Sequence, residues 1–329
     1  MNRRQFLSTA SAAGFASLSG CGGGDFDVEL LNVSYDPTRA LYRHINRMFA
    51  ADYFARTGKK VRVRQSHGGS GSQARVVIDG LRADVVTLAM WTDTDALRVR
   101  GLIEPKWEDR FPNKSLPYYS TIVFVVRKGN PFGIHDWPDL LKPGVKIITP
   151  NPKTSGGAKF NILGAWGATT RRGGSDADAR DFVRELLSRV PVLDSGARSA
   201  SVTFARKNIG DVHLTWENEA HLEARELKGE LEVITPKISV LAEPHVAVVD
   251  ANAALKGTTQ VAKEYLEYLY TPDAQAVIVD SHYRTGPPAK ELFRPTDLTL
   301  GGTPADWPAL HKAFFAEGGL FDQVYQPGG

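Results

Sequence analysis

The chain has 329 residues, 42% of them hydrophobic and 23% charged, which is the composition of a globular protein with room for two domains. Its formal charge of +3 falls to about +1 when Arg3 and Arg4, which belong to a predicted leader, are subtracted (+3 − 2 = +1). A nearly neutral chain without a basic run lacks the electrostatic footprint of a nucleic-acid-binding protein, so we expect no nucleic-acid partner.

The N-terminus has the pattern of an export signal. A twin-arginine pair, Arg3-Arg4, is followed by a weakly apolar stretch over residues 8–18 that is too short for a membrane-spanning helix. The stretch ends in Leu18-Ser-Gly-Cys21, which resembles the lipobox of bacterial lipoproteins. We therefore predict that residues 1–20 are removed and that Cys21, the only cysteine, carries a lipid. Residues 21–27 then form a glycine-rich tether.

From Glu29 onward, short β-type runs alternate with helical patterns. Strands are predicted at 30–34, 60–65, 84–89, 122–127, 145–149, 190–193, 212–215, 231–235 and 246–249. Apolar residues at helical spacing predict amphipathic helices whose stripes begin at Leu41, Ala74, Phe182 and Val261. This alternation predicts an α/β fold of mostly parallel sheets with helices on both faces. Ligands of such sheets bind at the carboxyl ends of the strands.

Four predicted strand-to-helix loops are rich in glycine and small polar residues. They are Tyr35–Arg39, Ser66–Gln73, Pro150–Gly157 and Asp194–Ser199. In the first loop, Asp36 before Pro37 fits a helix N-cap. A helix N-terminus presents unpaired N–H groups and a partial positive charge, so it stabilises an anion without a cationic side chain. Four such loops, placed where ligand loops belong, predict an oxyanion site.

The sequence contains little that indicates a catalytic or metal-binding site. No loop reads Gly-x4-Gly-Lys-Ser/Thr, so a nucleotide P-loop is absent. His67-Gly-Gly is similar to a hydrolase oxyanion loop, but Ser70 lies in no Gly-x-Ser-x-Gly elbow, and His67 is interpreted as a loop-packing residue. Glu217, Glu219 and His221 lack a His-Glu-x-x-His frame and are interpreted as a solvated helix end. We expect no enzyme, cofactor or metal; the alternative from another class is an esterase acting on sulfate or phosphate esters.

At the loops, the sequence resembles one family, the periplasmic sulfate-binding proteins of bacterial ABC importers, which include thiosulfate-binding relatives. The matching segments are Leu-Leu-Asn-Val-Ser-Tyr-Asp-Pro-Thr-Arg at 30–39, and residues 65–71, 119–124, 127–131, 145–158, 192–198, 210–212, 216–220 and 241–244. The resemblance covers about residues 28 to 285. It implies the type II periplasmic binding protein fold, an α/β fold in which each lobe is a mostly parallel sheet flanked by helices.

The same resemblance implies how the chain is divided. Residues 28–121 and 240–329 are expected to form lobe 1, and residues 122–239 lobe 2. Two crossover strands, within Ile122–Arg127 and Ser239–Val249, are expected to form the hinge.

Carried over residue by residue, the resemblance implies that sulfate is held by neutral donors. These are the backbone N–H groups of Asp36, Ser70, Gly156, Gly157 and Ala197, the Ser155 hydroxyl and the Trp216 indole N–H. Hydrogen bonds to a charged group contribute about 1.5–3 kcal/mol each. Seven of them can offset desolvation and still leave the ~8 kcal/mol that micromolar binding needs. We expect Arg198 or Arg39 to engage the Asp36 carboxylate and keep it from the ligand.

Together these features predict a protein that captures sulfate for an ABC importer, with thiosulfate, then molybdate or tungstate, as alternative ligands. A donor-only pocket leaves the proton of monohydrogen phosphate unpaired, which favours sulfate. The expected partners are the oxyanion and the permease subunits. The lipid on Cys21 is the expected link to the membrane, since no later segment has the ~20 apolar residues that span a bilayer. We expect an extracytoplasmic, periplasmic monomer.

Overall fold

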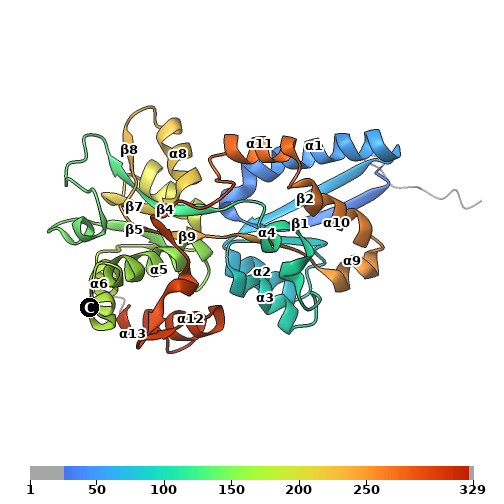
Figure 1. The fold of residues 1–329 in the computed structure, drawn as a ribbon. Helices are drawn as coiled ribbons and strands as arrows, with labels where there is room; N and C mark the ends of the chain where they lie inside the picture. Colours follow the sequence, from blue (N-terminus) through green and yellow to red (C-terminus); the bar gives the residue numbers. More distant parts are fainter. Residues whose placement is uncertain (1–25, 326–329) are drawn as a thin grey trace, which may run out of the picture.

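The computed structural model describes residues 26–325, so the predicted export signal and Cys21 lie outside the described residues. Two lobes lie side by side, each built on a β-sheet with helices packed against it (Figure 1). No helix in the described range is long and apolar enough to span a membrane. The α/β class with two lobes, predicted above, is confirmed.

The first lobe contains a four-stranded sheet in the order β10-β3-β1-β2. Its strands are β1 (Val28–Tyr35), β2 (Val61–Gly68), β3 (Val85–Leu88) and β10 (His245–Val248). Its helices are α1 (Arg39–Thr57), α2 (Ser70–Ile78), α3 (Trp91–Val99), α4 (Pro112–Ser115), α9 (Asp250–Lys256), α10 (Thr259–Tyr268) and α11 (Pro272–Asp280). Separate apolar clusters cover the two faces of the sheet, one with α1, α10 and α11 and the other with α2 and α3.

The second lobe contains a seven-stranded sheet in the order β11-β9-β4-β7-β5-β6, with β8 paired to β4. Its strands are β4 (Ser120–Arg127), β5 (Ile147–Pro150), β6 (Leu193–Asp194), β7 (Val212–Trp216), β8 (Leu231–Ile234), β9 (Ser239–Ala242) and β11 (Leu292–Phe293). Its helices are α5 (Gly156–Thr170), α6 (Asp176–Ser188), α7 (Ala197–Ser201), α8 (Glu217–Glu226), α12 (Trp307–Phe314) and α13 (Leu320–Val324). A small hairpin, β12 (Thr299–Leu300) with β13 (Thr303–Pro304), precedes α12.

Strands that follow one another within a lobe are parallel, whereas a strand that enters from the other lobe runs antiparallel to its neighbour. Within each lobe the consecutive strands are parallel, β1 with β2 and β3, and β5 with β6 and β7. The crossing strands β4 and β10 arrive from the opposite lobe, and they run antiparallel to β7 and β3. Along β4 the side chains alternate between two apolar clusters, with Phe124 in one and Val125 in the other, as expected for a strand buried on both faces.

The hinge differs from the prediction in one respect. The two predicted crossings are β4 and the run from β9 to β10, but the chain passes between the lobes a third time, from α11 to β11. Tyr119, just before β4, and Arg284, in the third passage, exchange two backbone hydrogen bonds of 2.9 Å. The third passage therefore lies hydrogen-bonded to the first.

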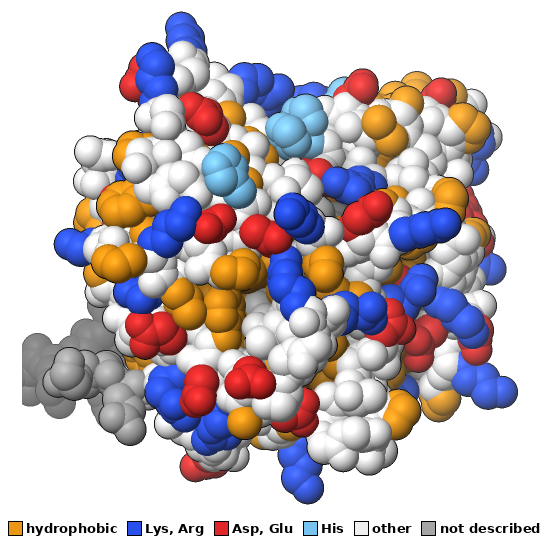
Figure 2. Space-filling model, turned by 60° about the vertical axis from the view of Figure 1, so that its left-hand side comes forward, with side chains coloured by type: hydrophobic (Ala, Val, Ile, Leu, Met, Phe, Trp, Pro, Cys, Tyr) orange, Lys and Arg blue, Asp and Glu red, His pale blue; other side chains and the backbone are white. Residues whose placement is uncertain are grey.

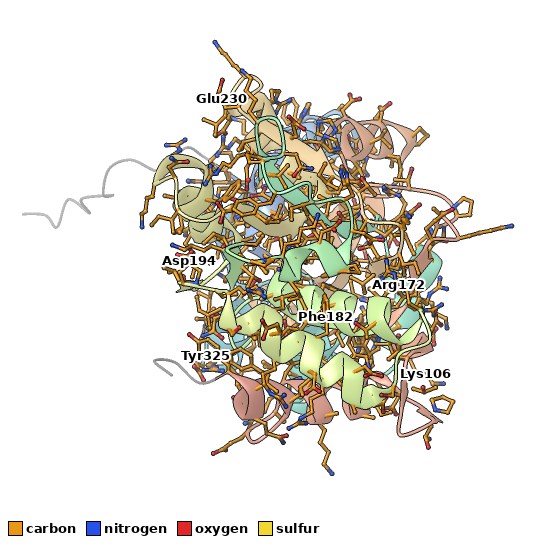
Figure 3. All side chains as sticks on the ribbon, turned by 90° about the vertical axis from the view of Figure 1, so that its left-hand side faces the viewer. Lys106, Arg172, Phe182, Asp194, Glu230 and Tyr325 are labelled. Carbon is orange, nitrogen blue, oxygen red and sulfur yellow. The ribbon has the colours of Figure 1, made fainter. Side chains whose placement is uncertain are left out.

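The predicted lobe boundary at residue 240 is wrong for two segments. Strands β9 and β11 belong to the sheet of the second lobe, and the segment that follows β11, up to Tyr325, packs on the same lobe, although it was expected in lobe 1. Phe293, Leu310, Phe314 and Phe321 enter the apolar cluster of the second lobe. Figure 3 shows Tyr325, directly after α13, close to α6, which carries Phe182. An apolar stripe predicts that a helix has a buried face, but not which lobe covers it.

Helix α5 is buried on nearly all sides, and its glycines allow close approach of neighbouring rings. A β-carbon on Gly167 would lie 2.1 Å from the nearest atom of the Phe293 ring. We expect Gly167→Ala to lower the free energy of unfolding by about 1–3 kcal/mol, because the clash outweighs the better helix propensity of alanine. Urea unfolding followed by circular dichroism measures this. Adding Phe293→Leu should recover part of the loss, and a Gly167→Ala variant more stable than wild type would contradict the packing argument.

Candidate functional site

The four loops that the sequence singled out meet between the lobes. A β-carbon on Gly69, just before α2, would lie 2.3 Å from the carbonyl oxygen of Thr154 and 3.1 Å from that of Ser195. The Thr154 hydroxyl donates to the Ser195 carbonyl at 2.7 Å, and the Ser72 N–H reaches the Thr154 carbonyl at 3.4 Å. The N-termini of α2, α5 and α7 therefore lie together, with the two lobes in contact.

Helix α5 contributes three of the predicted donors. Ser155 is its N-cap, and its hydroxyl oxygen accepts a hydrogen bond from the Ala158 N–H at 3.4 Å, which leaves the hydroxyl proton able to donate elsewhere. Gly156 and Gly157 are the first two helical residues, and their N–H groups have no partner within the helix. A β-carbon on Gly156 would lie 2.7 Å from the Ala89 Cβ and 3.1 Å from the Ser70 Cβ of the other lobe.

The first lobe faces this helix with Ser70, the first residue of α2. The Ser70 side chain is 1% exposed, and its hydroxyl accepts a hydrogen bond from the Ala89 N–H at 3.1 Å. That bond fixes the start of α2 against the end of β3, so the Ser70 N–H is presented from a rigid turn. Ala197 occupies the corresponding first position of α7 in the second lobe and is also buried.

Trp216 ends β7 and is the N-cap residue of α8. Its ring is 1% exposed and lies 5.1 Å from the Tyr35 ring of the first lobe and 5.5 Å from that of Phe160. A β-carbon on Gly157 would lie 2.4 Å from the indole nitrogen, so only glycine fits here. In this closed arrangement only narrow gaps remain around the Trp216 ring, and they are lined by Pro150, Gly157, Asn161, Ala197, Leu214, Thr215 and Trp216.

Asp36 is not the helix N-cap that the sequence predicted. It is the first residue of a short 3-10 helix, Asp36–Thr38, whose N-cap is Tyr35, and α1 begins only at Arg39. Its carboxylate accepts from the Arg39 guanidinium at 3.2 Å and from the Arg198 backbone N–H at the start of α7. Burial raises the pKa of the Asp36 carboxyl, and Arg39 opposes that shift. Arg198 thus meets the carboxylate through its main chain.

The start of α8 is not the solvated helix end that the sequence suggested. Glu217 is buried and pairs with Arg284 at 2.5 Å, while the His221 ring stacks on that of His282 at 4.7 Å between centroids. Burial, with a smaller effect of Glu223, raises the pKa of Glu219 to about 8. No group of three or more potential ligands in the described part of the chain is placed to hold a metal ion.

His67 was interpreted as a loop residue, but it lies near the end of strand β2, paired with Ser34 of β1, and is half-buried. Burial, with smaller effects of Arg39 and Arg43, lowers the pKa of His67 to about 4, so the ring is neutral near pH 7.

An ion pair between the lobes was not foreseen. Lys159 on α5 contacts Asp93 on α3 at 2.7 Å, and both side chains are about 5% exposed. The Phe315 ring lies 5.9 Å from the Lys159 ammonium. The sequence did not indicate this pairing, because 66 residues separate the two side chains and each lies on a helix with other polar residues. The pair lies one helical turn beyond the Gly156 N–H and joins the lobes beside the donor set.

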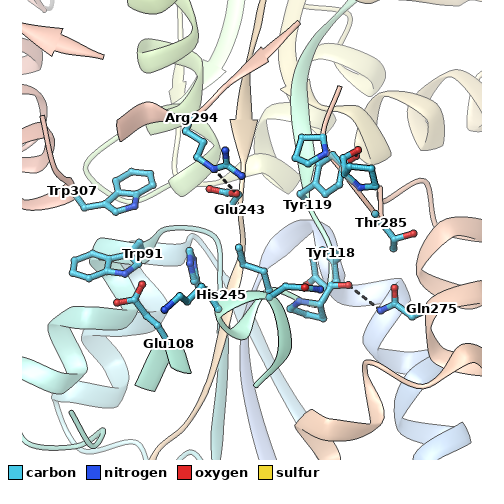
Figure 4. A pocket seen from close by; sticks show the side chains of 17 residues that line it. Trp91, Glu108, Tyr118, Tyr119, Glu243, His245, Gln275, Thr285, Arg294 and Trp307 are labelled. Carbon is cyan, nitrogen blue, oxygen red and sulfur yellow. Dashed lines mark hydrogen bonds and ion pairs between the residues drawn. The ribbon is translucent and has the colours of Figure 1, made fainter. Parts of the chain in front are cut away.

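Two large hollows in the described part of the chain lie away from the converging helix N-termini. One, of about 680 Å³, lies at the hinge, and Figure 4 shows Trp91 and Trp307 on opposite sides of it, with Glu243 paired to Arg294 at 3.2 Å. The other, of about 870 Å³, is an open groove between α2, α3 and α12. Both are far larger than an inorganic oxyanion, and both mix carboxylates with Lys and Arg side chains rather than gathering neutral donors. The helix N-termini beside Trp216 fit the predicted chemistry better, because they present backbone N–H groups.

The face of the molecule seen in Figure 2 carries no broad positive patch. Figure 2 shows Lys and Arg side chains interspersed with Asp and Glu over one face of the molecule. Attraction of an anion must therefore come from short-range donors rather than from net charge.

Two lobes, hinged by crossing strands and closed over converging helix N-termini, define this chain as a two-lobed binding protein of the periplasmic type. It belongs to the family of bacterial extracellular solute-binding proteins, whose model matches residues 32–284. The members of this family bind solutes and are not enzymes, which confirms the expectation that this chain is not an enzyme. The resemblance found in the sequence is likewise confirmed.

Individual relatives agree with this membership. The chain is 51% identical over 311 residues to the sulfate-binding protein of Escherichia coli K12, covering 91% of this chain and 93% of that protein. It is 44% identical over 334 residues to the thiosulfate-binding protein of Pseudomonas aeruginosa PAO1, covering 99% of both. The solved structure of the sulfate-binding protein SubI from Mycobacterium tuberculosis H37Rv matches with a TM-score of 0.77 and 29% identity, covering 88% of this chain and 99% of that one.

Proposed function

We propose that this chain captures sulfate between its lobes and delivers it to the membrane subunits of an ABC importer. The observation that carries the proposal is that the N-termini of α2, α5 and α7 converge beside the Trp216 indole. The residues at these helix starts and the indole ring are buried. Each group that we assign to the ion donates a hydrogen bond, which suits an anion without a proton. The similarity to the E. coli sulfate-binding protein supports this choice of ligand.

In this proposal seven donors hold the ion. They are the N–H groups of Asp36, Ser70, Gly156, Gly157 and Ala197, the Ser155 hydroxyl and the Trp216 Nε1–H. The Asp36 carboxylate, engaged by Arg39 and by the Arg198 main chain, is directed to α7 rather than to the ion. Because no donor needs a formal charge, the ion is stabilised by local dipoles.

The proposal includes a lipid-anchored monomer outside the cytoplasm. The lipobox-like run ending at Cys21 supports the anchor, and the following glycines give the protein reach from the membrane. Labelling with a radioactive fatty acid tests this, since Cys21→Ala should abolish incorporation and release the protein into the soluble fraction.

Thiosulfate is the second candidate ligand. The P. aeruginosa thiosulfate-binding protein is similar over almost the whole length of this chain, and the two oxyanions are both fully ionised and tetrahedral at sulfur. Isothermal titration with sulfate, thiosulfate, molybdate and phosphate separates the candidates. We expect sulfate to bind with micromolar or tighter affinity and phosphate to compete poorly near pH 7. Competition by phosphate at equal concentration would refute the donor-only explanation, and absence of sulfate binding would refute the proposed ligand.

Trp216→Phe tests the single side-chain N–H. Phenylalanine keeps the contacts with Tyr35 and Phe160 but removes the Nε1–H, so sulfate affinity should fall about 10- to 100-fold, the value of one hydrogen bond to a charged group. Isothermal titration measures the loss. Trp166→Phe, on the far part of α5 against Phe314, is the matched control and should leave affinity unchanged. Wild-type affinity in Trp216→Phe would remove the indole from the donor set.

A further inference from the structure

His221 and His282 form a contact between the lobes beside the hinge, near the Arg284–Glu217 ion pair. His221 lies on α8 of the second lobe, and His282 follows α11 of the first. Their rings are stacked, with centroids 4.7 Å apart and planes inclined by 29°. His282 is held in the left-handed region, with φ of 61°, and its N–H donates to the Val279 carbonyl at 2.9 Å. The backbone therefore aims this ring at the partner lobe.

We propose that His282, stacked on His221, is a positioning residue that makes capture of the oxyanion pH-dependent, by opposing lobe closure when it is protonated. This inference rests on the proposed function. A neutral His282 ring stacks on His221 without penalty, whereas a charged ring in this contact loses part of its hydration. Protonation of His282 thus favours the open state, in which the charge is hydrated.

The charged groups around the pair determine the sign of the effect. Burial is the largest influence and lowers the pKa of His282, followed by His221 and Arg225 on α8, while Glu217 and Asp280 act in the opposite direction. Glu217 is already held by Arg284. The closed state therefore binds a proton at His282 less readily than the open state does. Closure is fully favoured above the ordinary histidine pKa of about 6.5 and is weakened as the pH falls through that value.

Sulfate carries no titratable proton between about pH 5.5 and pH 8, so the ligand does not contribute to the pH dependence. We expect the Kd for sulfate of the full protein to rise about fivefold or more from pH 8 to pH 5.5, since linkage to one proton allows up to tenfold per pH unit. His282→Gln and His221→Gln should each reduce this change to less than about twofold, with affinities at pH 8 close to wild type. Isothermal titration at both pH values measures all three proteins.

His44→Gln is the matched control, because His44 is an exposed histidine on α1 of the first lobe. It should keep the full pH dependence. The proposal is overturned if the wild-type Kd does not change with pH, if affinity rises at pH 5.5, or if both glutamine variants retain the wild-type pH profile. A chain that binds neither sulfate nor thiosulfate at pH 8 would instead reject the proposed function, and this inference with it.

Discussion

Gly156→Ala is expected to weaken sulfate binding roughly 100-fold, about 2.7 kcal/mol, while leaving each lobe folded. The added methyl group would lie 2.7 Å from the Ala89 Cβ and 3.1 Å from the Ser70 Cβ, both in the opposite lobe. Carbon atoms in contact prefer about 3.5–4.0 Å, so the lobes cannot reach their closed arrangement. Isothermal titration gives the affinity, and small-angle X-ray scattering with saturating sulfate shows whether the protein still becomes more compact.

Gly71→Ala provides the matched control. Gly71 also lies at a helix start facing the other lobe, but its β-carbon would meet the Thr154 carbonyl oxygen and the Asp93 Oδ1 at 3.6 and 3.7 Å, which are ordinary contacts. Its affinity should stay within about threefold of wild type. Unaltered binding by Gly156→Ala would mean that the ligand is held in a more open arrangement than the one described here.

Breaking the ion pair between the lobes should have a comparable effect. Lys159→Met leaves the Asp93 carboxylate buried on closure without its partner, and Asp93→Leu does the same to the ammonium. Loss of one member of a buried pair costs about 3–5 kcal/mol, so either variant should bind sulfate more than 100-fold more weakly. The double variant should recover most of the affinity, because no buried charge remains. Stopped-flow tryptophan fluorescence should assign the loss mainly to faster dissociation.

The pair of Lys153 and Asp322 is a suitable control. It also joins a lysine to an aspartate, at 2.8 Å, but it lies within the second lobe and about one third of each side chain is exposed. Lys153→Met should change affinity by less than about threefold. If Asp93→Leu strengthened binding while Lys159→Met weakened it, Lys159 would act by attracting the anion rather than by joining the lobes.

The local fold could be predicted well from the sequence, whereas the assembly of distant segments could not. The apolar run Ile122-Val-Phe-Val-Val126 lies in the strand predicted at 122–127, and the structure has β4 there. Strand β6 was predicted over 190–193 but spans only Leu193–Asp194, because it pairs with β5 for two residues. Helix α12 was assigned to the wrong lobe because its apolar residues, Leu310 and Phe314, suit any apolar surface.

The candidate site also has parts that could be predicted from the sequence and parts that could not. The loops that precede α2, α5 and α7 could be recognised from the sequence, because glycine and serine are typical of helix N-termini and act there through neighbouring residues. The partners of Asp36 were harder to predict. Arg39 is three residues away and was named as a partner. Arg198 was named too, but it bonds to the carboxylate through its main-chain N–H, which a pattern of side chains does not indicate. The contacts of His221 with His282 and of Lys159 with Asp93 depend on how the lobes close, and sequence spacing carries no information about that.

The third passage of the chain through the hinge restricts how the lobes can move. Since the segment at Arg284 is hydrogen-bonded to Tyr119 beside the first crossing, the lobes are unable to twist freely about the long dimension of the molecule. What remains is a swing about one axis, so each cycle of opening should return the same helix ends to the same register.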